Sequence, residues 1–369
     1  MPIFIAPNNP LTIIPVRAIC GAFCMESAAT ASLYRTGIHW KLPQQSPYKS
    51  EYAEDHGVKI IRLLDAAANV EVRIAPSLGN RAYAMDVNGA NILHMPAASI
   101  AELNQLSGIP FLAPWANRMP HGFHAGGKWF PWNESLGNLR MLQPHVAIHG
   151  MLFASDLWQV TDLGSDSSAA WAISRLQFWR YPALMANWPF AHDYEMTYRL
   201  SGGTLETSIA VRNLGAEPMP VSIGFHPYFQ IPNVPRDACT ARIPARTAVL
   251  TDEGLLATGE FRPNTLPDPL PLANRTLDNG FTDLIRDSAG AALFVLEGGG
   301  ARVEVEFGPK WQVAVVYCPS GHEFICFEPM AAVTNGVNLA AEGIYPALQT
   351  LEPGATWRES FRVRASGVH

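Results

Sequence analysis

The sequence of 369 residues has few charged residues and no long uninterrupted apolar run. Charged residues make up only 16% of the chain and hydrophobic residues 48%, which excludes extensive disorder and predicts a large buried core. The net charge of -6 gives nucleic acid or an anionic membrane no electrostatic reason to bind. We therefore expect a globular protein with neither partner, whose ligand is a neutral small molecule.

Cysteine is also scarce, and several common motifs are missing. The five cysteines are Cys20, Cys24, Cys239, Cys318 and Cys326, an odd number without metal-type pairing. We expect mostly free thiols, with Cys318 and Cys326 buried as small apolar residues and a disulfide between them as the alternative. No GxGxxG, P-loop or C-x-x-C sequence is present, so nucleotide binding, hydride transfer and thiol redox chemistry have no support.

The first 56 residues carry no clear functional signal. Residues 11–24 are fairly apolar, but Arg17 interrupts them, and neither a charged segment before them nor a cleavage site after them is evident. They predict neither a signal peptide nor a membrane span. Residues 44–55 are polar and contain proline, which is typical of a linker. We expect residues 1–56 to be a flexible extension or linker, with Met25 as an alternative start, and we expect a cytoplasmic location.

From residue 57 onward the pattern predicts many short β-strands. Apolar or alternating runs are separated by Gly, Pro and Asn turn signals, and Ser201-Gly202-Gly203 predicts a hairpin turn. The runs cover residues 59–64, 70–74, 83–87, 157–163, 170–178, 194–200, 204–211, 301–307, 311–317 and 324–327. Helix-like pieces are short, such as residues 98–106. With 29 Gly and 30 Pro, this pattern predicts one all-β domain over residues 57–369, an antiparallel sandwich or barrel.

A histidine stands out at the end of one extended run. His226 follows residues 221–225 and precedes Pro227, which must terminate the strand. A strand exit is a place where a rigid sheet can aim a side chain into a cleft. Histidine titrates near neutrality and can give a proton to a leaving oxygen. The alternative is a buried histidine bonded to a backbone carbonyl.

Four sequence blocks, in this order, resemble the aldose 1-epimerase (galactose mutarotase) family. They are GIPFLAPWANRM at 108–119, IHG at 148–150, EPMPV followed by HPYF within 217–229, and FEPM at 327–330, with Asn335 and Asn338 downstream. The resemblance spans roughly residues 57–364. It implies a large antiparallel β-supersandwich, galactose mutarotase-like, with its site in an open cleft on one sheet. It also implies an isomerase that interconverts the α and β anomers of a free hexose without a metal or another cofactor.

The resemblance implies catalytic roles for three residues. His226 would protonate the ring oxygen, and Glu328 would take the proton of the anomeric hydroxyl. Burial would raise the proton affinity of Glu328 toward the range that such a base needs. His149 would orient the sugar for these transfers. The alternatives are an outward-facing charge for Glu328 and an ordinary sheet residue for His149.

Substrate binding is implied for three other residues. Asn117 and Arg118 match the Asn-Arg pair whose guanidinium binds sugar hydroxyls, although Arg118 is alternatively a surface cation. Asp278 matches the aspartate that accepts hydrogen bonds from hydroxyls. Because Asp278-Asn-Gly280 is also typical of a turn, Asp283 is the competing carboxylate.

Histidine pairs and aromatic residues offer further interpretations. His145 and His149 have the spacing of zinc ligands on a helix, but residues 146–148 look extended, so we expect no metal there. His121 and His124 lie in a Gly-rich loop without a neighbouring carboxylate or thiol, and we expect no metal there either. The aromatic residues that could stack on a pyranose are Trp115, Trp129, Trp132 and Tyr228, although core packing is the common role.

Three alternative functions remain open at this level. A hexose-6-phosphate 1-epimerase would need additional cations, and a non-catalytic sugar-binding protein would lack the acid or the base. A carbohydrate lyase would need a tyrosine or another base at a uronic acid carbon. Fold alone does not separate these alternatives.

Overall fold

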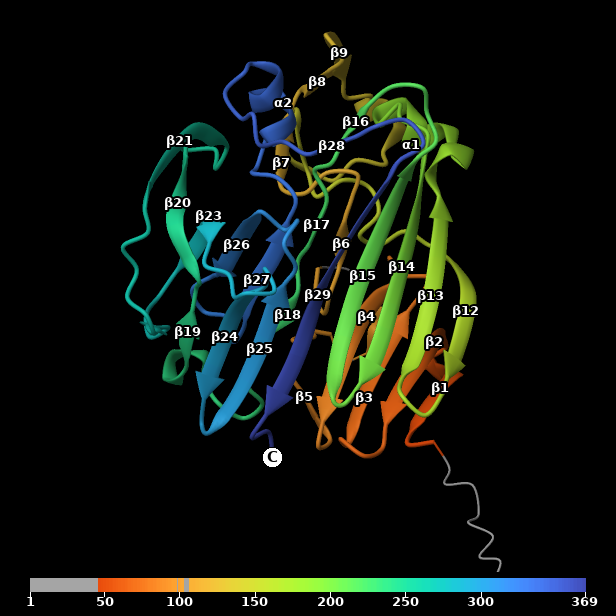
Figure 1. The fold of residues 1–369 in the computed structure, drawn as a ribbon, viewed down its shortest axis with the longest axis vertical. Helices are drawn as coiled ribbons and strands as arrows, with labels where there is room; N and C mark the ends of the chain where they lie inside the picture. The colour runs from red at the N-terminus through yellow and green to blue at the C-terminus, as the bar shows by residue number, and fades with distance from the viewer. Residues whose placement is uncertain (1–45, 98, 103–105) are drawn as a thin grey trace, which may run out of the picture. The chain divides into compact units, whose positions relative to one another are not determined.

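The computed structural model describes residues 46–97, 99–102 and 106–369, which fold mainly into antiparallel β-sheets (Figure 1). The largest sheet has nine strands. In spatial order they are β12 (Gln159–Ser165), β13 (Ala170–Gln177), β14 (His192–Ser201), β15 (Thr204–Asn213), β29 (Thr356–Ser366), β25 (Ala301–Phe307), β24 (Ala292–Gly298), β19 (Thr240–Arg242) and β22 (Leu270–Pro271). The predicted hairpin turn joins β14 to β15, where Gly202 and Gly203 have φ of +55° and +72°.

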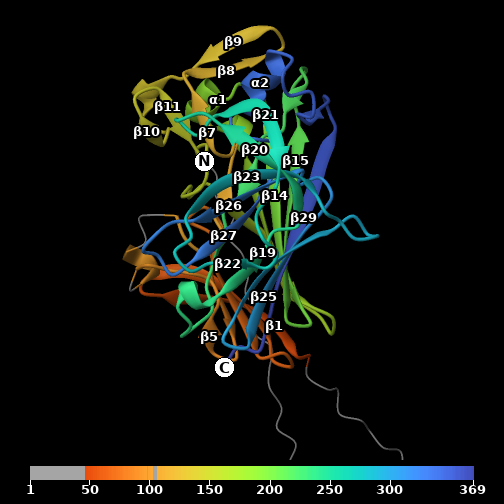
Figure 2. The ribbon, with the colours of Figure 1, turned by 90° about the vertical axis from the view of Figure 1, so that its left-hand side faces the viewer.

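The second sheet has eight strands and carries Glu328 on β27, with His226 in the segment between its strands β17 and β18. Its strands are β21 (Ala257–Pro263), β20 (Ala245–Thr251), β23 (Leu277–Leu284), β26 (Val313–Cys318), β27 (Ile325–Met330), β17 (Gly224–Phe225) and β6 (Phe111–Leu112), with β18 (Tyr228–Phe229) also paired to β27. This sheet packs on the nine-stranded sheet, as the view in Figure 2 shows. Phe327 of β27 contacts Phe294 of β24 with ring centroids 5.5 Å apart.

The N-terminal sheet differs from the sequence expectation. Its five strands are β1 (Tyr48–Asp55), β2 (Val58–Asp65), β3 (Val70–Ala75), β4 (Arg81–Val87) and β5 (Ala90–Asn91). β1 lies in the segment expected to be a linker, yet it pairs with β2 from Tyr48 opposite Asp65 to Asp55 opposite Val58. The linker prediction is wrong for this part because a strand at a sheet edge, with one exposed face, needs few apolar residues. The rest of the expected extension, residues 1–45, lies outside the described residues.

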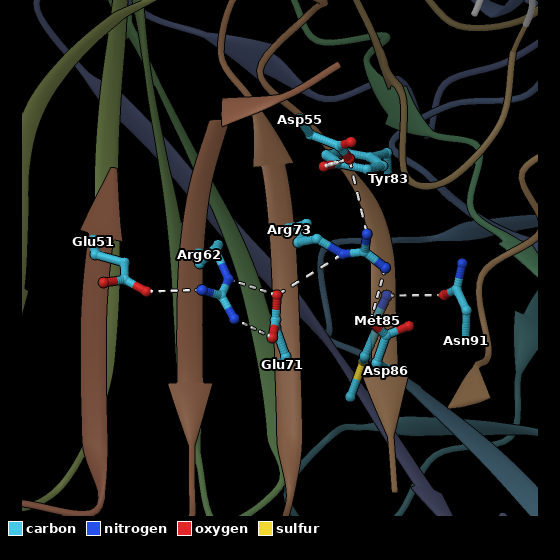
Figure 3. A network of polar contacts seen from close by, with 9 residues as sticks. All are labelled: Glu51, Asp55, Arg62, Glu71, Arg73, Tyr83, Met85, Asp86 and Asn91. Carbon is cyan, nitrogen blue, oxygen red and sulfur yellow. Dashed lines mark hydrogen bonds and ion pairs between the residues drawn. The ribbon is translucent and has the colours of Figure 1, made fainter. Parts of the chain in front are cut away.

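The outer face of this sheet is covered by paired charges, shown in Figure 3. Arg62 Nη1 lies 3.0 Å from Glu51 Oε1, and its Nε donates to Glu71 Oε1 at 2.7 Å. Arg73 Nη2 lies 2.7 Å from Asp86 Oδ2 on the next strand. Cross-strand pairs of this kind contribute roughly 0.2–1 kcal/mol each, so they stabilise the strand order modestly. The opposite face carries apolar residues of the main core.

Short elements complete the described part of the chain. Three small sheets contain β7 (Arg118–Pro120) with β10 (Met141–Gln143) and β11 (Val146–Ile148), β8 (Gly122–Ala125) with β9 (Lys128–Pro131), and β16 (Met219–Pro220) with β28 (Thr350–Leu351). The helices are α1 (Pro182–Asn187) and α2 (Gly336–Ala341), with 3-10 turns at Ile100–Glu102, Glu134–Leu136, Phe178–Arg180 and Arg236–Ala238. A helix was expected at residues 98–106. The described residues of this segment contain a 3-10 turn at Ile100–Glu102. Among the described residues, every helix is too short or too polar to cross a bilayer.

Candidate active site

The centre of the candidate site is a contact between a residue of strand β27 and a residue of the short segment that joins β17 to β18. Glu328 lies on β27, where alternate residues face opposite sides of the sheet. Since Phe327 faces the core, Glu328 faces the other side, where His226 Nε2 lies 3.3 Å from its Oε1. The side chains are 1% and 7% exposed, so this contact is almost completely shielded from solvent.

Strand pairing on both sides of His226 explains this contact. Gly224 of β17 is opposite Met330, and Tyr228 of β18 is opposite Cys326. His226 stands midway between the two pairs and is thereby placed opposite Glu328. β17 ends before Pro227, as the sequence predicts.

Burial shifts the pKa values of Glu328 and His226 in opposite directions. Loss of hydration, assisted by the charge of Asp278, raises the pKa of Glu328 well above its usual value. Loss of hydration lowers the pKa of His226 to about 3. His226 Nδ1 and Glu328 Oε2 are buried without a hydrogen-bond partner. Because neither group alone accommodates a charge well, the pair is suited to hold a single proton between its two members.

His149 lies beside this pair in a fixed protonation state. Its ring meets that of His226 edge-on, with centroids 5.4 Å apart. The backbone N–H of Asn117 donates to His149 Nδ1 at 3.3 Å, and the N–H of His149 donates to the Asn117 carbonyl at 3.0 Å. Because Nδ1 accepts, a neutral ring carries its proton on Nε2. Burial lowers the pKa of His149 well below its usual value, which keeps the ring neutral.

Arg118 and Asp278 form the more exposed part of the site. Arg118 Nη2 lies 3.4 Å from Asp278 Oδ2, with side chains 14% and 35% exposed. Backbone contacts with Thr334 and Asn335 hold Arg118: the Arg118 N–H donates to Thr334 Oγ1 at 3.3 Å, and the Asn335 N–H donates to the Arg118 carbonyl at 3.1 Å. Asp283 instead pairs with Arg246 at 3.1 Å on an exposed surface. Asp278 is therefore the carboxylate beside the other candidates.

A small hollow joins the candidate binding residues. Asn117, Arg118 and Asp278 line it, together with Gly280 and Val315. Gly280 is opposite Val315, and Val315 is opposite Glu328. The hollow therefore lies along the row of cross-strand neighbours that leads to Glu328. A larger hollow between the β8–β9 hairpin and α2 is lined by none of the six predicted site residues.

The other histidines do not form the zinc site that spacing alone would suggest. His145 is exposed and contacts Glu134 at 2.7 Å, whereas His149 is buried beside Asn117. Residues 146–148 form β11, so the expected extended conformation is confirmed. His121 stacks on His145 with centroids 5.4 Å apart. A different group, His226, Cys326 and Glu328, places donor atoms within 4.8 Å of one another.

The aromatic candidates divide between core and site. Trp115 and Trp132 stack on each other at 4.4 Å inside the core, and Trp129 is 43% exposed beside His124. Tyr228 alone of the four contacts a catalytic candidate, since it stacks on His226 with centroids 4.6 Å apart.

Sequence reasoning missed Tyr317, whereas its expectation that Cys318 and Cys326 are buried is confirmed. Tyr317 contacts His226 edge-on at 5.8 Å, and Cys326 lies directly opposite Tyr317 in the sheet. Cys326 and Glu328 are two residues apart on one strand and thus share a face, which the sequence could have indicated. The pairing of Tyr317 depends on strand register and has no local signal. Cys318 and Cys326 are free thiols, so the alternative disulfide is not formed.

Comparison with known proteins relates this chain to one family. The sequence model of the aldose 1-epimerase family matches residues 84–364. The uncharacterized protein YphB of Escherichia coli (strain K12) is 27% identical over 237 residues, which cover 60% of this chain and 71% of YphB.

Solved structures show the same fold. A galactose mutarotase-like protein from Clostridium acetobutylicum aligns with a TM-score of 0.76 and 21% identity, covering 87% of this chain and 99% of that one. Galactose 1-epimerase from Lactobacillus acidophilus NCFM aligns with a TM-score of 0.66 and 15% identity, covering 87% and 100%. The predicted all-β, galactose mutarotase-like fold is confirmed. Because the family match covers most of the chain, this protein belongs to the aldose 1-epimerase family.

Proposed function

We propose that this protein is an aldose 1-epimerase that interconverts the α and β anomers of a free hexose. The observation that carries the proposal is the buried contact between His226 and Glu328, whose pKa values are shifted in opposite directions. Two groups that share one proton can supply an acid and a base in the same step. Family membership makes sugar the expected ligand.

In the proposed reaction the proton of the pair resides on His226 when a sugar binds. The Glu328 carboxylate takes the proton of the C1 hydroxyl while the bond from C1 to the ring oxygen breaks. The ring oxygen keeps that electron pair and receives the proton of His226, which leaves an open-chain aldehyde, a neutral histidine and a protonated Glu328. Rotation about the C1–C2 bond and reversal of both transfers give the other anomer.

Neighbouring residues have positioning roles in this proposal. The Nε2–H of His149 is a donor for a sugar oxygen, and the unpartnered amide of Asn117 is a second donor. Arg118 and Asp278 offer a donor and an acceptor at the more exposed part of the site. Such fixed groups hold the sugar in the geometry that proton transfer requires.

Polarimetry on freshly dissolved α-glucose and α-galactose tests the proposal. We expect the protein to accelerate mutarotation, and Glu328→Gln or His226→Ala to lower the rate about 10²-fold to 10⁴-fold while the circular dichroism spectrum is retained. Unchanged rates in folded variants would refute the assigned roles. Rates no higher than the spontaneous reaction with wild-type protein would favour a non-catalytic sugar-binding protein.

The two remaining alternatives have weaker support. A lyase would need a tyrosine base, but burial raises the pKa values of Tyr228 and Tyr317, the tyrosines that contact His226. A phosphate would need several free cations, whereas Arg118 is paired with Asp278, and the exposed Arg140 packs over Phe153. Comparing kcat/KM for glucose and glucose 6-phosphate at one salt concentration tests this choice. A preference of about tenfold for the phosphate would overturn the free-sugar assignment.

A further inference from the structure

Three side chains that bind soft or borderline metal ions converge on the face of the eight-stranded sheet that holds the proposed site. One ring nitrogen of His226, Cys326 Sγ and a carboxylate oxygen of Glu328 all lie within 4.8 Å of one another. The three residues are 5%, 0% and 1% exposed. The proposed epimerase reaction uses His226 and Glu328 and leaves Cys326 without a role.

Two observations indicate unused binding capacity in this cluster. His226 Nδ1 and Glu328 Oε2 are buried and have no hydrogen-bond partner. Buried polar atoms usually have a partner, and one that lacks it calls for an explanation. Cys326 is a free thiol, and its position opposite Tyr228 in the sheet fixes it on the same face as Glu328.

We propose that His226, Cys326 and Glu328 form a zinc site that overlaps the sugar site, so that bound Zn²⁺ blocks the reaction. The binding part of this inference stands independently, whereas the inhibitory part rests on the proposed function. On binding, Zn²⁺ displaces the thiol proton of Cys326 and the proton shared by the other two residues, and both protons leave to solvent.

The three ligand atoms, a nitrogen, a sulfur and a carboxylate oxygen, favour zinc over hard cations such as Mg²⁺ and Ca²⁺. Zn²⁺ takes sulfur, nitrogen and carboxylate ligands in tetrahedral geometry, whereas Mg²⁺ and Ca²⁺ require oxygen ligands. With metal–ligand distances of about 2.0–2.3 Å, neighbouring donors of a tetrahedral site are roughly 3.3–3.5 Å apart. His226 Nε2 and Glu328 Oε1 already satisfy this spacing at 3.3 Å. Only Cys326 Sγ, whose distance to the other donor atoms is at most 4.8 Å, has to approach, by up to about 1.5 Å. Three protein ligands leave a fourth position for water.

Metal binding is measured on the full chain, in a background with Cys20→Ser and Cys24→Ser. These thiols lie outside the described residues and are removed because they are potential competing ligands. Isothermal titration calorimetry should show one Zn²⁺ per chain, undiminished by excess Mg²⁺ or Ca²⁺. Co²⁺ should give the near-ultraviolet charge-transfer band of a thiolate–cobalt bond. No stoichiometric Zn²⁺ binding would overturn the proposal.

A pair of cysteine variants locates the site. Cys326→Ser should lose the cobalt band and weaken Zn²⁺ binding about tenfold or more, since even outer-shell changes have effects of this size. Cys318→Ser is the matched control, because Cys318 is equally buried and free but lies next to Tyr317 on the opposite face of the sheet. Retention of the band in Cys326→Ser, or its loss in Cys318→Ser, would overturn the assignment.

An activity measurement then tests the overlap with the sugar site. We expect Zn²⁺ to inhibit the wild-type protein in competition with sugar, and Cys326→Ser to keep its basal rate while its inhibition constant rises about tenfold or more. Equal inhibition of both proteins would refute the overlap. If the wild-type protein shows no mutarotase activity but binds Zn²⁺ through Cys326, the proposed function fails and the zinc site stands.

Discussion

His226 Nε2 lies 3.3 Å from Glu328 Oε1, although the two residues belong to different segments of the eight-stranded sheet. Backbone pairing on either side of His226 fixes this contact, so its geometry depends on the sheet and not on a flexible loop. The contact is buried, and this burial costs stability because neither residue ionises easily there.

Replacing the buried carboxyl of Glu328 should make the protein more stable than wild type, and the difference should grow as the pH rises. Because the folded-state pKa of Glu328 is raised, the folded chain holds a proton that the unfolded chain loses above about pH 4.5. The free energy of unfolding of the wild-type protein therefore falls as the pH rises from about 4.5 toward the raised pKa of Glu328. The Glu328→Gln variant has no carboxyl at this position and does not lose stability in this way. We expect the variant to be more stable by about 1–3 kcal/mol at pH 8 and by less at pH 5. Urea unfolding at both pH values measures the difference, and a variant less stable than wild type at pH 8 would contradict the prediction.

The pH dependence of catalysis should reflect one shared proton. The pair gains a second proton only near the lowered pKa of His226, about 3, and loses its proton only above the raised pKa of Glu328. We expect kcat, corrected for the spontaneous reaction, to be nearly constant from roughly pH 5 to 7 and to fall in stronger acid and in alkali. An inflection near pH 6.5 would instead indicate an ordinary, solvated histidine.

Two substitutions of Asn117 distinguish the role of its backbone N–H from the role of its side-chain amide. Asn117 has φ of +59°, a conformation that Gly adopts freely and Ala does not. Asn117→Gly should keep the backbone N–H that orients His149, and its melting temperature should not change. Because this variant loses the side-chain amide, its KM should rise about tenfold. Asn117→Ala should raise KM equally and also lose roughly 1 kcal/mol of stability. If KM is unchanged in the Gly variant, the amide does not bind the sugar.

The glycine before Phe225 should be essential for the placement of His226. A Cβ added at Gly224 would overlap Met330 Sδ and lie 2.9 Å from the Pro329 carbonyl oxygen. Gly224→Ala should therefore displace β17 and lower both the melting temperature and kcat. Gly254→Ala is the control, since its Cβ would come no closer than 3.3 Å to the Asp252 carboxylate. Equal effects of the two substitutions would refute the steric explanation.

Strand β1 should contribute to stability. We compare chains that start at residue 46 and at residue 57, which differ by β1 and the turn that follows it. The shorter chain loses the pairing with β2 and the hydrogen bond from the Gly202 N–H to Tyr48 Oη at 3.0 Å. Its melting temperature should be several degrees lower, because an unpaired β2 also exposes a new sheet edge. Identical melting curves would mean that β1 is dispensable and that the expected boundary at residue 57 describes the stable domain.

Local sequence patterns predicted many of the individual strands, and the four blocks that resemble a known family supplied the catalytic candidates. Alternation predicted β25 at 301–307 with the bounds that the structure has, and Gly202 and Gly203 indicated the hairpin. These signals succeed because side-chain alternation and positive φ depend on a few neighbouring residues. β29, a central strand of the largest sheet, was not predicted, although Trp357, Phe361 and Val363 are buried along it. Exposed arginines between them obscure its apolar face.

Tertiary structure alone decided which residues meet. No local pattern indicates that Tyr317 or Cys326 adjoins His226. The choice between Asp278 and Asp283 as the carboxylate beside Arg118 was also open at the level of sequence. Each of these contacts depends on the register between strands that are distant along the chain. The shifts in pKa also depend on burial, which the packing of the complete sheets creates. Register and burial are collective properties of the folded chain, whereas the residue types that make the chemistry feasible are written in the sequence itself.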